Sequence, residues 1–366
     1  MMKPTIKISQ ETPDVIRFTL SNADVCIANS LRRVLISEIP TVGIVTDTHA
    51  TNKCNITANT TRFHNEILKH RLSCIPIHIN EPSKFDLNKY IIVVDKQNDS
   101  DKQMYITTED FNIVDVDTKL PVNKTVRDAI FPKNKITNYY IDFCKLRPKL
   151  ADDLEGECLK FTATMEIVKG SKTFNTCSVA SYGNTVDTKL AAAKWDEKEK
   201  ELRSSMSKEE ISYEKTNWYL LEAKRLFIPN SFDFTIETVG VYTNRQLVQM
   251  ACNVILQKMD TLKTIIDEGN LQIEPSLSTL HNCFDIKIMN ENYTVGNLLS
   301  YMVNIIYKDT NEIKYNGVQK PHPHDDFIVL RLSLESKYNE EFINICLLTS
   351  IKYIIDIYSQ ISKHSS

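Results

Sequence analysis

The sequence is poor in glycine and lacks the short motifs that mark nucleotide-binding and hydrolytic enzymes. Only eight glycines occur in 366 residues, which leaves few places for a loop that cradles phosphate. No P-loop, G-x-G-x-x-G or G-x-S-x-G motif is present. The nine cysteines are scattered without a Cys-x-x-C pair, so neither a zinc ribbon nor a disulfide framework is predicted. We interpret them as reduced thiols of an intracellular protein.

The chain also lacks a strong net charge, a signal peptide and a long apolar run. Its net charge is −3, so no global field draws it to nucleic acid, and we expect no specific direct DNA binding. The N-terminus, MMKPTIKISQ, has no apolar core of the kind that secretion requires. No run of 18 apolar residues occurs, so no membrane association is expected.

The most informative stretch is residues 27–45, IANSLRRVLISEIPTVGIV. Its apolar residues recur at helical spacing and predict an amphipathic helix, which Asn22 or Asp24 can cap. The opposite face carries Asn29, Arg32 and Arg33. Pro40 ends the helix because the residue before a proline avoids helical geometry. The chain then continues as a strand over 42–45.

A later stretch, residues 284–302, repeats this pattern without a gap. Asn29 aligns with Asn297, an offset of 297 − 29 = 268. The alternating strand 15–20 then falls on 283–288, and Asn22 falls on Asn290. Each copy is a strand, a polar turn and a helix, although few residues are identical.

Each copy is followed much later by a long helix with an apolar stripe, over 244–267 and 340–361. Each half alone offers a thin core, whereas two halves packed through their helices would bury both stripes. The predicted fold class is therefore α+β, with two pseudo-symmetric dimerisation modules fused in one chain. The first module takes residues 1–46 and 226–270, and the second takes residues 271–366.

The residues between, 47–225, are expected to form a mixed, mainly β inserted domain. Residues 60–73 predict a helix with Phe63, Ile67, Leu68 and Leu72 on one face. Residues 90–94 and 159–167 predict strands. Residues 189–208 are dense in both charge signs and predict a solvated helix or a mobile loop.

Two clusters resemble parts of metal sites. His322-Pro-His324-Asp325-Asp326 holds two histidines and two carboxylates, which are zinc ligands, and a metal-dependent hydrolase is the alternative function. The flanking prolines favour a structural loop instead. His64-Asn65-Glu66 resembles the H-x-E of zinc deaminases, but the required P-C-x-x-C is missing, which favours polar contacts on a helix surface.

The motifs Asn29-Ser30-Leu31-Arg32-Arg33 and Glu38-Ile39-Pro40-Thr41 resemble the signature of the alpha-type subunits of multisubunit RNA polymerases. These are bacterial alpha, archaeal D and the third-largest subunit of RNA polymerase II. The block from Asn59 to Pro76 is similar to their next motif. Tyr293 to Leu299, with Tyr315-Asn316-Gly317 and Lys320 to Pro323, resembles the smaller partner, archaeal L or the eleventh subunit of RNA polymerase II.

The resemblance implies a non-catalytic scaffold and assembly subunit, a fused alpha-like dimer on which the two largest catalytic subunits dock for transcription. Small polymerase subunits are further expected partners, and no small-molecule substrate is expected. The chain needs no cofactor or catalytic residue of its own, because magnesium lies in the catalytic subunits of the nucleotidyltransferase complex. The residues expected at partner docking are Asn29, Arg32, Arg33, Glu38, His64, Glu66, His70 and Arg71. The residues expected at dimerisation are Leu31, Leu35, Val248, Ala251, Ile255, Leu262, Leu298, Leu299, Leu347, Ile351, Ile354 and Tyr358.

Two departures from the family pattern bear on this expectation. Many third-largest subunits carry a four-cysteine zinc cluster after the Ile-Pro, but residues 80–142 contain no cysteine, so that metal is predicted absent. Bacterial alpha also has a C-terminal DNA-binding domain, whereas this chain ends after its last helix. Fusion of the two partners resembles polymerases of large DNA viruses. A viral chain would lie in the virion and the host cytoplasm, and a chain of a nuclear polymerase would lie in the nucleus.

Overall fold

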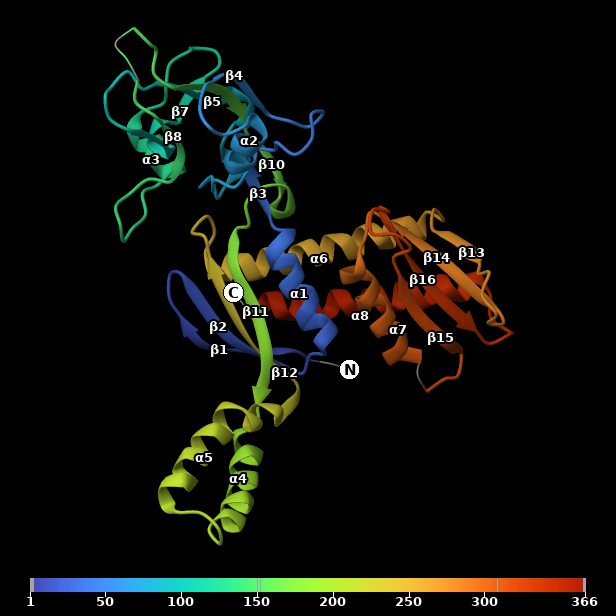
Figure 1. The fold of residues 1–366 in the computed structure, drawn as a ribbon. Coiled ribbons are helices and arrows are strands. Elements are labelled where there is room, and N and C mark those ends of the chain that lie inside the picture. The colour runs from blue at the N-terminus through green and yellow to red at the C-terminus, as the bar shows by residue number, and fades with distance from the viewer. Residues whose placement is uncertain (1–2, 150, 152, 308, 365–366) are drawn as a thin grey trace. The chain divides into compact units, whose positions relative to one another are not determined.

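The structure, a computed structural model, describes residues 3–149, 151, 153–307 and 309–364 (Figure 1). The chain divides into two units. Unit 1 consists of Met1–Val34, Val179–Ile236 and Val248–Ser366, and unit 2 consists of Leu35–Ser178 and Glu237–Leu247. The expected α+β class is confirmed. The division differs from the expected insert, 47–225, because part of that segment pairs into a sheet of unit 1.

Unit 1 contains two halves with the same order of elements. The first half consists of β1 (Thr5–Glu11), β2 (Val15–Ser21), α1 (Val25–Ser37), β11 (Cys177–Val186), β12 (Phe227–Thr238) and α6 (Asn244–Asp267). The second half consists of β13 (Gln272–Pro275), β14 (Cys283–Met289), α7 (Tyr293–Tyr307), β15 (Ile313–Gln319), β16 (Phe327–Leu334) and α8 (Glu340–His364). The strand orders, β1-β2-β12-β11 and β13-β14-β16-β15, are the same. The two halves therefore share one topology, β-β-α-β-β-α.

Local backbone geometry supports the alignment of the two copies. Asn22 and Asn290, which are 268 residues apart, both adopt the left-handed conformation, with φ of 58° and 57°. Asparagine tolerates this conformation, so each marks the turn from strand to helix. Asp24 then accepts a hydrogen bond from the N–H of Cys26 at 2.9 Å. Asn292 accepts one from the N–H of Thr294 at 2.8 Å. Both helices thus begin with the same kind of cap.

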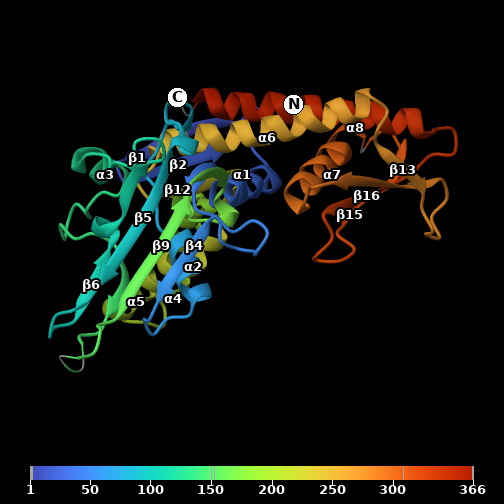
Figure 2. The same ribbon diagram turned by 90° about the horizontal axis from the view of Figure 1, so that it is seen from above.

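The long helices lie side by side in both Figure 1 and Figure 2. Their buried positions match at an offset of 346 − 247 = 99, which aligns Leu247 with Cys346 and Leu262 with Ile361. On length and composition alone, α8 could cross a membrane. However, its stripe of buried side chains, from Ile343 to Ile361, lies within unit 1.

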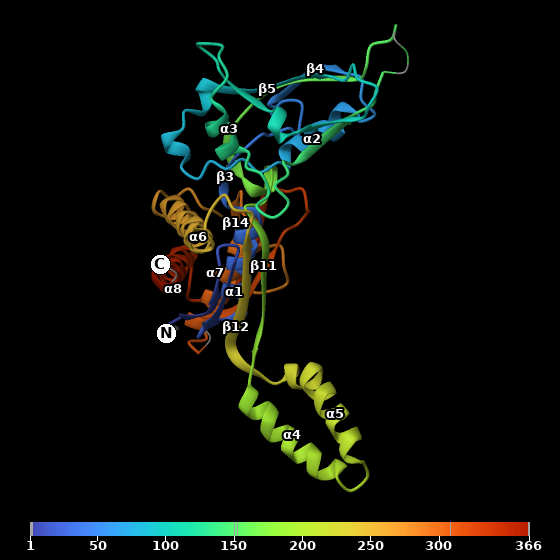
Figure 3. The same cartoon turned by 90° about the vertical axis from the view of Figure 1, so that its left-hand side faces the viewer.

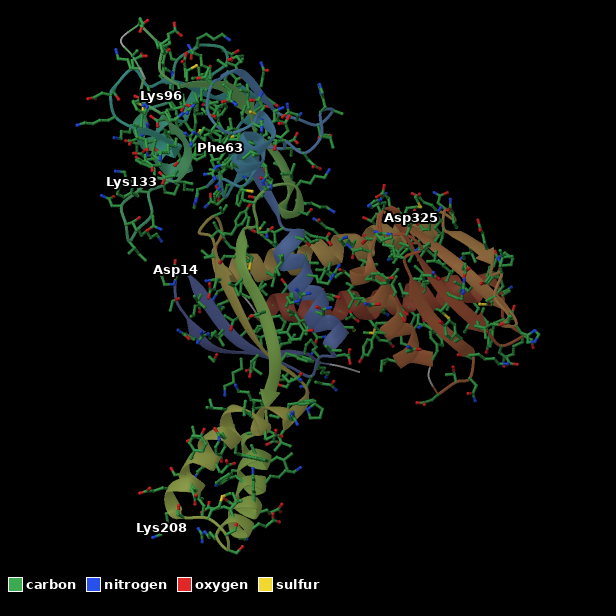
Figure 4. The ribbon with its side chains drawn as sticks, viewed as in Figure 1. Asp14, Phe63, Lys96, Lys133, Lys208 and Asp325 are labelled. Carbon is green, nitrogen blue, oxygen red and sulfur yellow. The ribbon has the colours of Figure 1, made fainter. Side chains whose placement is uncertain are left out.

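A helical hairpin interrupts the first half between β11 and β12. It consists of α4 (Thr188–Leu202), α5 (Lys208–Leu220) and a short 3₁₀ turn, Glu222–Arg225. Figure 3 shows the hairpin projecting from the end of these two strands, and Figure 4 shows Lys208 at its far end. Trp195 is buried, and its ring centroid lies 6.3 Å from that of Trp218. The charged segment 189–208 is therefore helical over most of its length.

Unit 2 is mainly β, as expected of the insert. Its strands are β3 (Pro40–Gly43), β4 (Cys54–Asn59), β5 (Tyr90–Gln97), β6 (Met104–Thr107), β7 (Asn112–Asp115), β8 (Asp142–Leu146), β9 (Cys158–Thr164) and β10 (Glu166–Lys169). Its helices are α2 (Asn65–Ser73) and α3 (Lys124–Ile130), with short 3₁₀ turns at Pro82–Lys84, Leu87–Lys89, Thr108–Asp110 and Gly170–Lys172. The sheets are β4-β9-β5-β7, β10-β3 and β6-β8. Phe111 packs edge-on against Phe131, Phe143 and Phe161 in the core.

Three local predictions for unit 2 need correction. The helix expected from Thr60 begins only at Asn65, because the Asn59 side chain binds residues 61 and 63 in a turn. On this helix Leu68 and Leu72 are buried and Ile67 is exposed, and Phe63, which precedes the helix, is also exposed. The strand expected over 159–167 is divided into β9 and β10, which pair with different strands.

Candidate functional site

The main candidate site is the set of contacts between the two halves of unit 1. All twelve side chains expected at dimerisation are buried, with exposed fractions of at most 4%. In addition, α8 of the second half contacts β1 of the first half. The two halves are therefore in contact through α8 and β1, and burial of apolar side chains is expected to supply most of the stability of unit 1.

Helices α1 and α7 make polar contacts with each other at matching positions. The Ser30 hydroxyl donates to the carbonyl oxygen of Thr294 at 3.3 Å. The Arg33 Nε donates to the Thr294 hydroxyl at 2.8 Å. The counterpart of Arg33 is Tyr301, since 301 − 33 = 268, and it lies close to Asp24 at the start of α1. Burial and the Asp24 carboxylate raise the pKa of Tyr301 to about 12.

Two further polar contacts join the long helices to the opposite half. The Tyr358 hydroxyl on α8 donates to the Ile27 carbonyl at 3.0 Å, and its side chain is fully buried. Burial raises the pKa of Tyr358 well above its ordinary value. On α6, the Lys258 Nζ lies 2.8 Å from an oxygen of Glu291, which precedes α7. The positions that match Tyr358 and Lys258 at the offset of 99 hold Met259 and Ile357. The two halves therefore have the same backbone topology, but the polar side chains that each contributes to the interface differ.

The docking residues expected on α1 fall into two groups. Asn29 accepts hydrogen bonds from the Nε and Nη2 of Arg32 at 3.0 and 2.9 Å, so this pair is held within its own helix. Arg33 instead reaches the second half through Thr294. Arg33 was expected on the solvated face, where it would contact a partner. The structure shows that it also makes a hydrogen bond to the other half.

The other expected docking residues lie in unit 2. Glu66 and His70 line a polar cavity of about 550 Å³ beside α2. His64 is exposed at the start of that helix. Arg71 donates to the carbonyl oxygens of Phe143 and Asp142 at 2.9 and 3.0 Å, which ties α2 to β8.

Glu38, the remaining expected docking residue, is largely buried. Only 8% of it is exposed, and its carboxylate lies 3.6 Å from the Lys169 Nζ. Of the eight expected residues it is therefore the one least accessible from solvent.

The His322 loop forms a turn that is closed by its own side chains. Asp325 accepts a hydrogen bond from the N–H of His322 at 3.0 Å, and the His322 Nδ1 accepts one from the N–H of His324 at 3.2 Å. Figure 4 shows Asp325 in this loop between β15 and β16. Among the described residues, no three His, Cys, Asp or Glu side chains are grouped to hold a metal. The hydrolase alternative therefore receives no support.

Several residues of the interface were missed by the sequence analysis. They are Ser30, Thr294, Tyr301, Lys258 and Glu291. A signal for some of them existed in the repeat, because the offset of 268 aligns Arg33 with Tyr301. The spatial pairing of each with the opposite half could not be obtained from spacing along the chain.

Comparison with known proteins places these observations in one family. Residues 17–259 match the family described as the RNA polymerase Rpb3/Rpb11 dimerisation domain. The chain is 26% identical over 277 residues to DNA-directed RNA polymerase subunit Rpo3 of Thermococcus kodakarensis, covering 69% of this chain and 94% of that protein. It is 40% identical over 74 residues to subunit 3 of DNA-directed RNA polymerases II, IV and V of Arabidopsis thaliana, covering 20% of this chain and 21% of that protein.

Proposed function

Since this chain belongs to the RNA polymerase Rpb3/Rpb11 dimerisation domain family, we propose that it is a non-catalytic subunit on which a DNA-directed RNA polymerase assembles. The observation that carries this proposal is the joined pair of β-β-α-β-β-α halves in unit 1. A preformed pair offers two related faces, which suits a platform that must hold two large partners.

The finer proposal is that one chain combines an Rpb3-type half and an Rpb11-type half. The family match ends at residue 259. The Tyr293 to Leu299 motif and the repeated topology support an Rpb11-type assignment for the rest. A large DNA virus as the source, with action in the virion and host cytoplasm, is proposed on the resemblance of this fusion to viral polymerases.

The proposed partners are the two largest polymerase subunits, together with small polymerase subunits. Asn29 and Arg32 form the docking face proposed on α1, because a guanidinium held beside an amide can pair bidentately with a carboxylate. Nucleotide transfer, with its magnesium, would belong to the large subunits.

The test is affinity purification of the tagged chain from its native cells, followed by mass spectrometry. The two largest subunits are expected in about equal amounts with the wild-type chain. A chain that is recovered alone would overturn the proposal.

Arg32→Glu is expected to reduce recovery of one large subunit about tenfold, which corresponds to about 1.4 kcal/mol. The fold should persist, since the hydrogen bonds that Arg32 makes among the described residues go to Asn29 of the same helix. Lys263→Glu, at an exposed position of α6, is the matched control with the same change of charge. Equal recovery with both variants would remove Arg32 from the docking face.

A further inference from the structure

A groove between α7 and α8 lies outside the proposed docking face. Its volume is about 260 Å³. The lining includes Met302, Ile305, Ile306, Tyr353, Ile357 and Asp356. Ile305 is 54% exposed, although it is a large apolar residue on a helix of unit 1. Ile306 and Tyr353 beside it are half-buried, whereas Met302 and Ile357 are buried. Apolar surface that is exposed beside a hollow is typical of sites where another molecule binds.

The matching positions of the first half show that the fold does not require this apolar lining. The offset of 268 places Ser37 where the second half has Ile305. The offset of 99 places Lys258 where the second half has Ile357, and Gln257 where it has Asp356. The same topology is thus built with a serine and a lysine in one half where the other half has two isoleucines, whereas the position of Asp356 is polar in both halves.

A negative charge at the edge of the groove indicates which kind of segment can bind there. Asp356 is the charged residue of the lining. Within the described part of the chain it is exposed and makes no ion pair. An apolar segment that carries a lysine or arginine would fill the hollow and pair with this carboxylate at its edge.

We propose that this groove binds an apolar segment of a polymerase subunit, and that a basic side chain of this segment pairs with Asp356. This proposal rests on the proposed function and extends it. The first half has Ser37 and Lys258 at the positions of Ile305 and Ile357, so it does not repeat the apolar lining at these two points. The segment is therefore recognised by the second half and not by the first.

Site-specific photocrosslinking in the assembled complex identifies the occupant directly. A benzophenone amino acid replaces Ile305 in one tagged chain and Ile345 in another. Ile345 is the control, because it is 56% exposed on α8 and does not line the groove. Position 305 is expected to crosslink to one polymerase subunit, at an apolar segment with a nearby lysine or arginine, and position 345 is not. Crosslinking at 305 to any other class of protein, or to none while the complex assembles, overturns the proposal.

Two charge variants supply a second measurement. Ile305→Lys and Asp356→Lys are each expected to reduce recovery of the crosslinked subunit at least tenfold, whereas Ile345→Lys leaves recovery unchanged. Thermal unfolding of each variant shows whether the fold is retained. Full recovery with a folded Ile305→Lys chain contradicts the groove proposal alone. If the wild-type chain brings no polymerase subunit, the proposed function itself has failed.

Discussion

The buried polar residues between the two halves set which surfaces pair. Lys258 and Glu291 are only 12% and 15% exposed in their side chains, and their charged atoms lie 2.8 Å apart. Removing one partner of such a pair leaves a charge with poor hydration, whereas replacing both can be nearly neutral. We therefore expect the pair to favour the correct matching of the halves more than it adds to stability.

Lys258→Met is expected to lower the free energy of unfolding by about 3 kcal/mol, because it removes the cationic partner of the largely buried Glu291 carboxylate. Lys258→Met with Glu291→Leu should recover most of this loss. Denaturant unfolding of both variants measures the coupling energy between Lys258 and Glu291. Lys263→Met, which removes an exposed lysine of the same helix, is the control. Equal losses in the single and double variants would show that the pair is not coupled.

Tyrosines at the interface predict sensitivity to alkaline pH. Burial and Asp24 raise the pKa of Tyr301 from 10.0 to about 12. Between these values the unfolded chain loses the proton while the folded chain keeps it, so the free energy of unfolding falls as the pH rises. Below pH 10 both states are protonated and this contribution to stability is fully present.

The slope of the unfolding free energy against pH is proportional to the number of protons released on unfolding. In this pH range, Tyr301→Phe should reduce that number by up to one. Denaturant unfolding at a series of pH values measures it, with Tyr213→Phe, at a 69% exposed position, as control. An unchanged slope in Tyr301→Phe would contradict the assignment.

At the scale of elements, the hairpin of α4 and α5 is an addition to a sheet that is complete without it. β11 and β12 are neighbours in the sheet, and the N–H of Asp187 donates to the Leu226 carbonyl at 2.9 Å. The matching strands β15 and β16 are joined by a short loop without helices. Both tryptophans of the chain, Trp195 and Trp218, lie in the hairpin.

Replacing residues 188–225 with Asn-Gly, which favours a tight hairpin turn, should leave unit 1 folded. The melting temperature measured by circular dichroism should change by only a few degrees, about 4 °C or less. In the intact chain, tryptophan fluorescence should report unfolding of the hairpin alone. Aggregation of the shortened chain would show that the hairpin supports the sheet.

At the scale of the whole chain, the connection between the halves is a short exposed turn. The α6 helix ends at Asp267, and Gly269 follows with φ of 72°, a conformation that glycine adopts without strain. No buried side chain lies between Glu268 and Asn270. The contacts of the halves, rather than this connection, should hold unit 1 together.

A protease site inserted between Gly269 and Asn270 tests this prediction. After cleavage the two pieces should elute together in size-exclusion chromatography and separate only in denaturant. A chain with the insertion that is left uncut is the control. Separation of the pieces in native buffer would show that the covalent link is required.

The sequence determined most of the helices and strands, and it determined which apolar side chains of unit 1 are buried. The periodicity of α6 gave its bounds, Asn244–Asp267, and the stripe of α8 was read nearly to its end. All twelve residues expected at dimerisation are buried, although burial alone does not assign them to the contact between the halves. Spacing succeeds here because a helix that buries one face must repeat its apolar residues every three to four positions.

Only the tertiary structure decided which polar groups meet across the halves and where the inserted segment divides. Arg33 looked like a solvated arginine along the sequence, yet it bonds to Thr294, 261 residues away. Residues 179–225 were assigned to the insert from the sequence, yet β11 pairs with β12 in the first sheet. The periodicity of a segment indicates which of its side chains are buried. A hydrogen bond between the halves depends on two segments that folding brings together. The local sequence of either segment does not specify its partner.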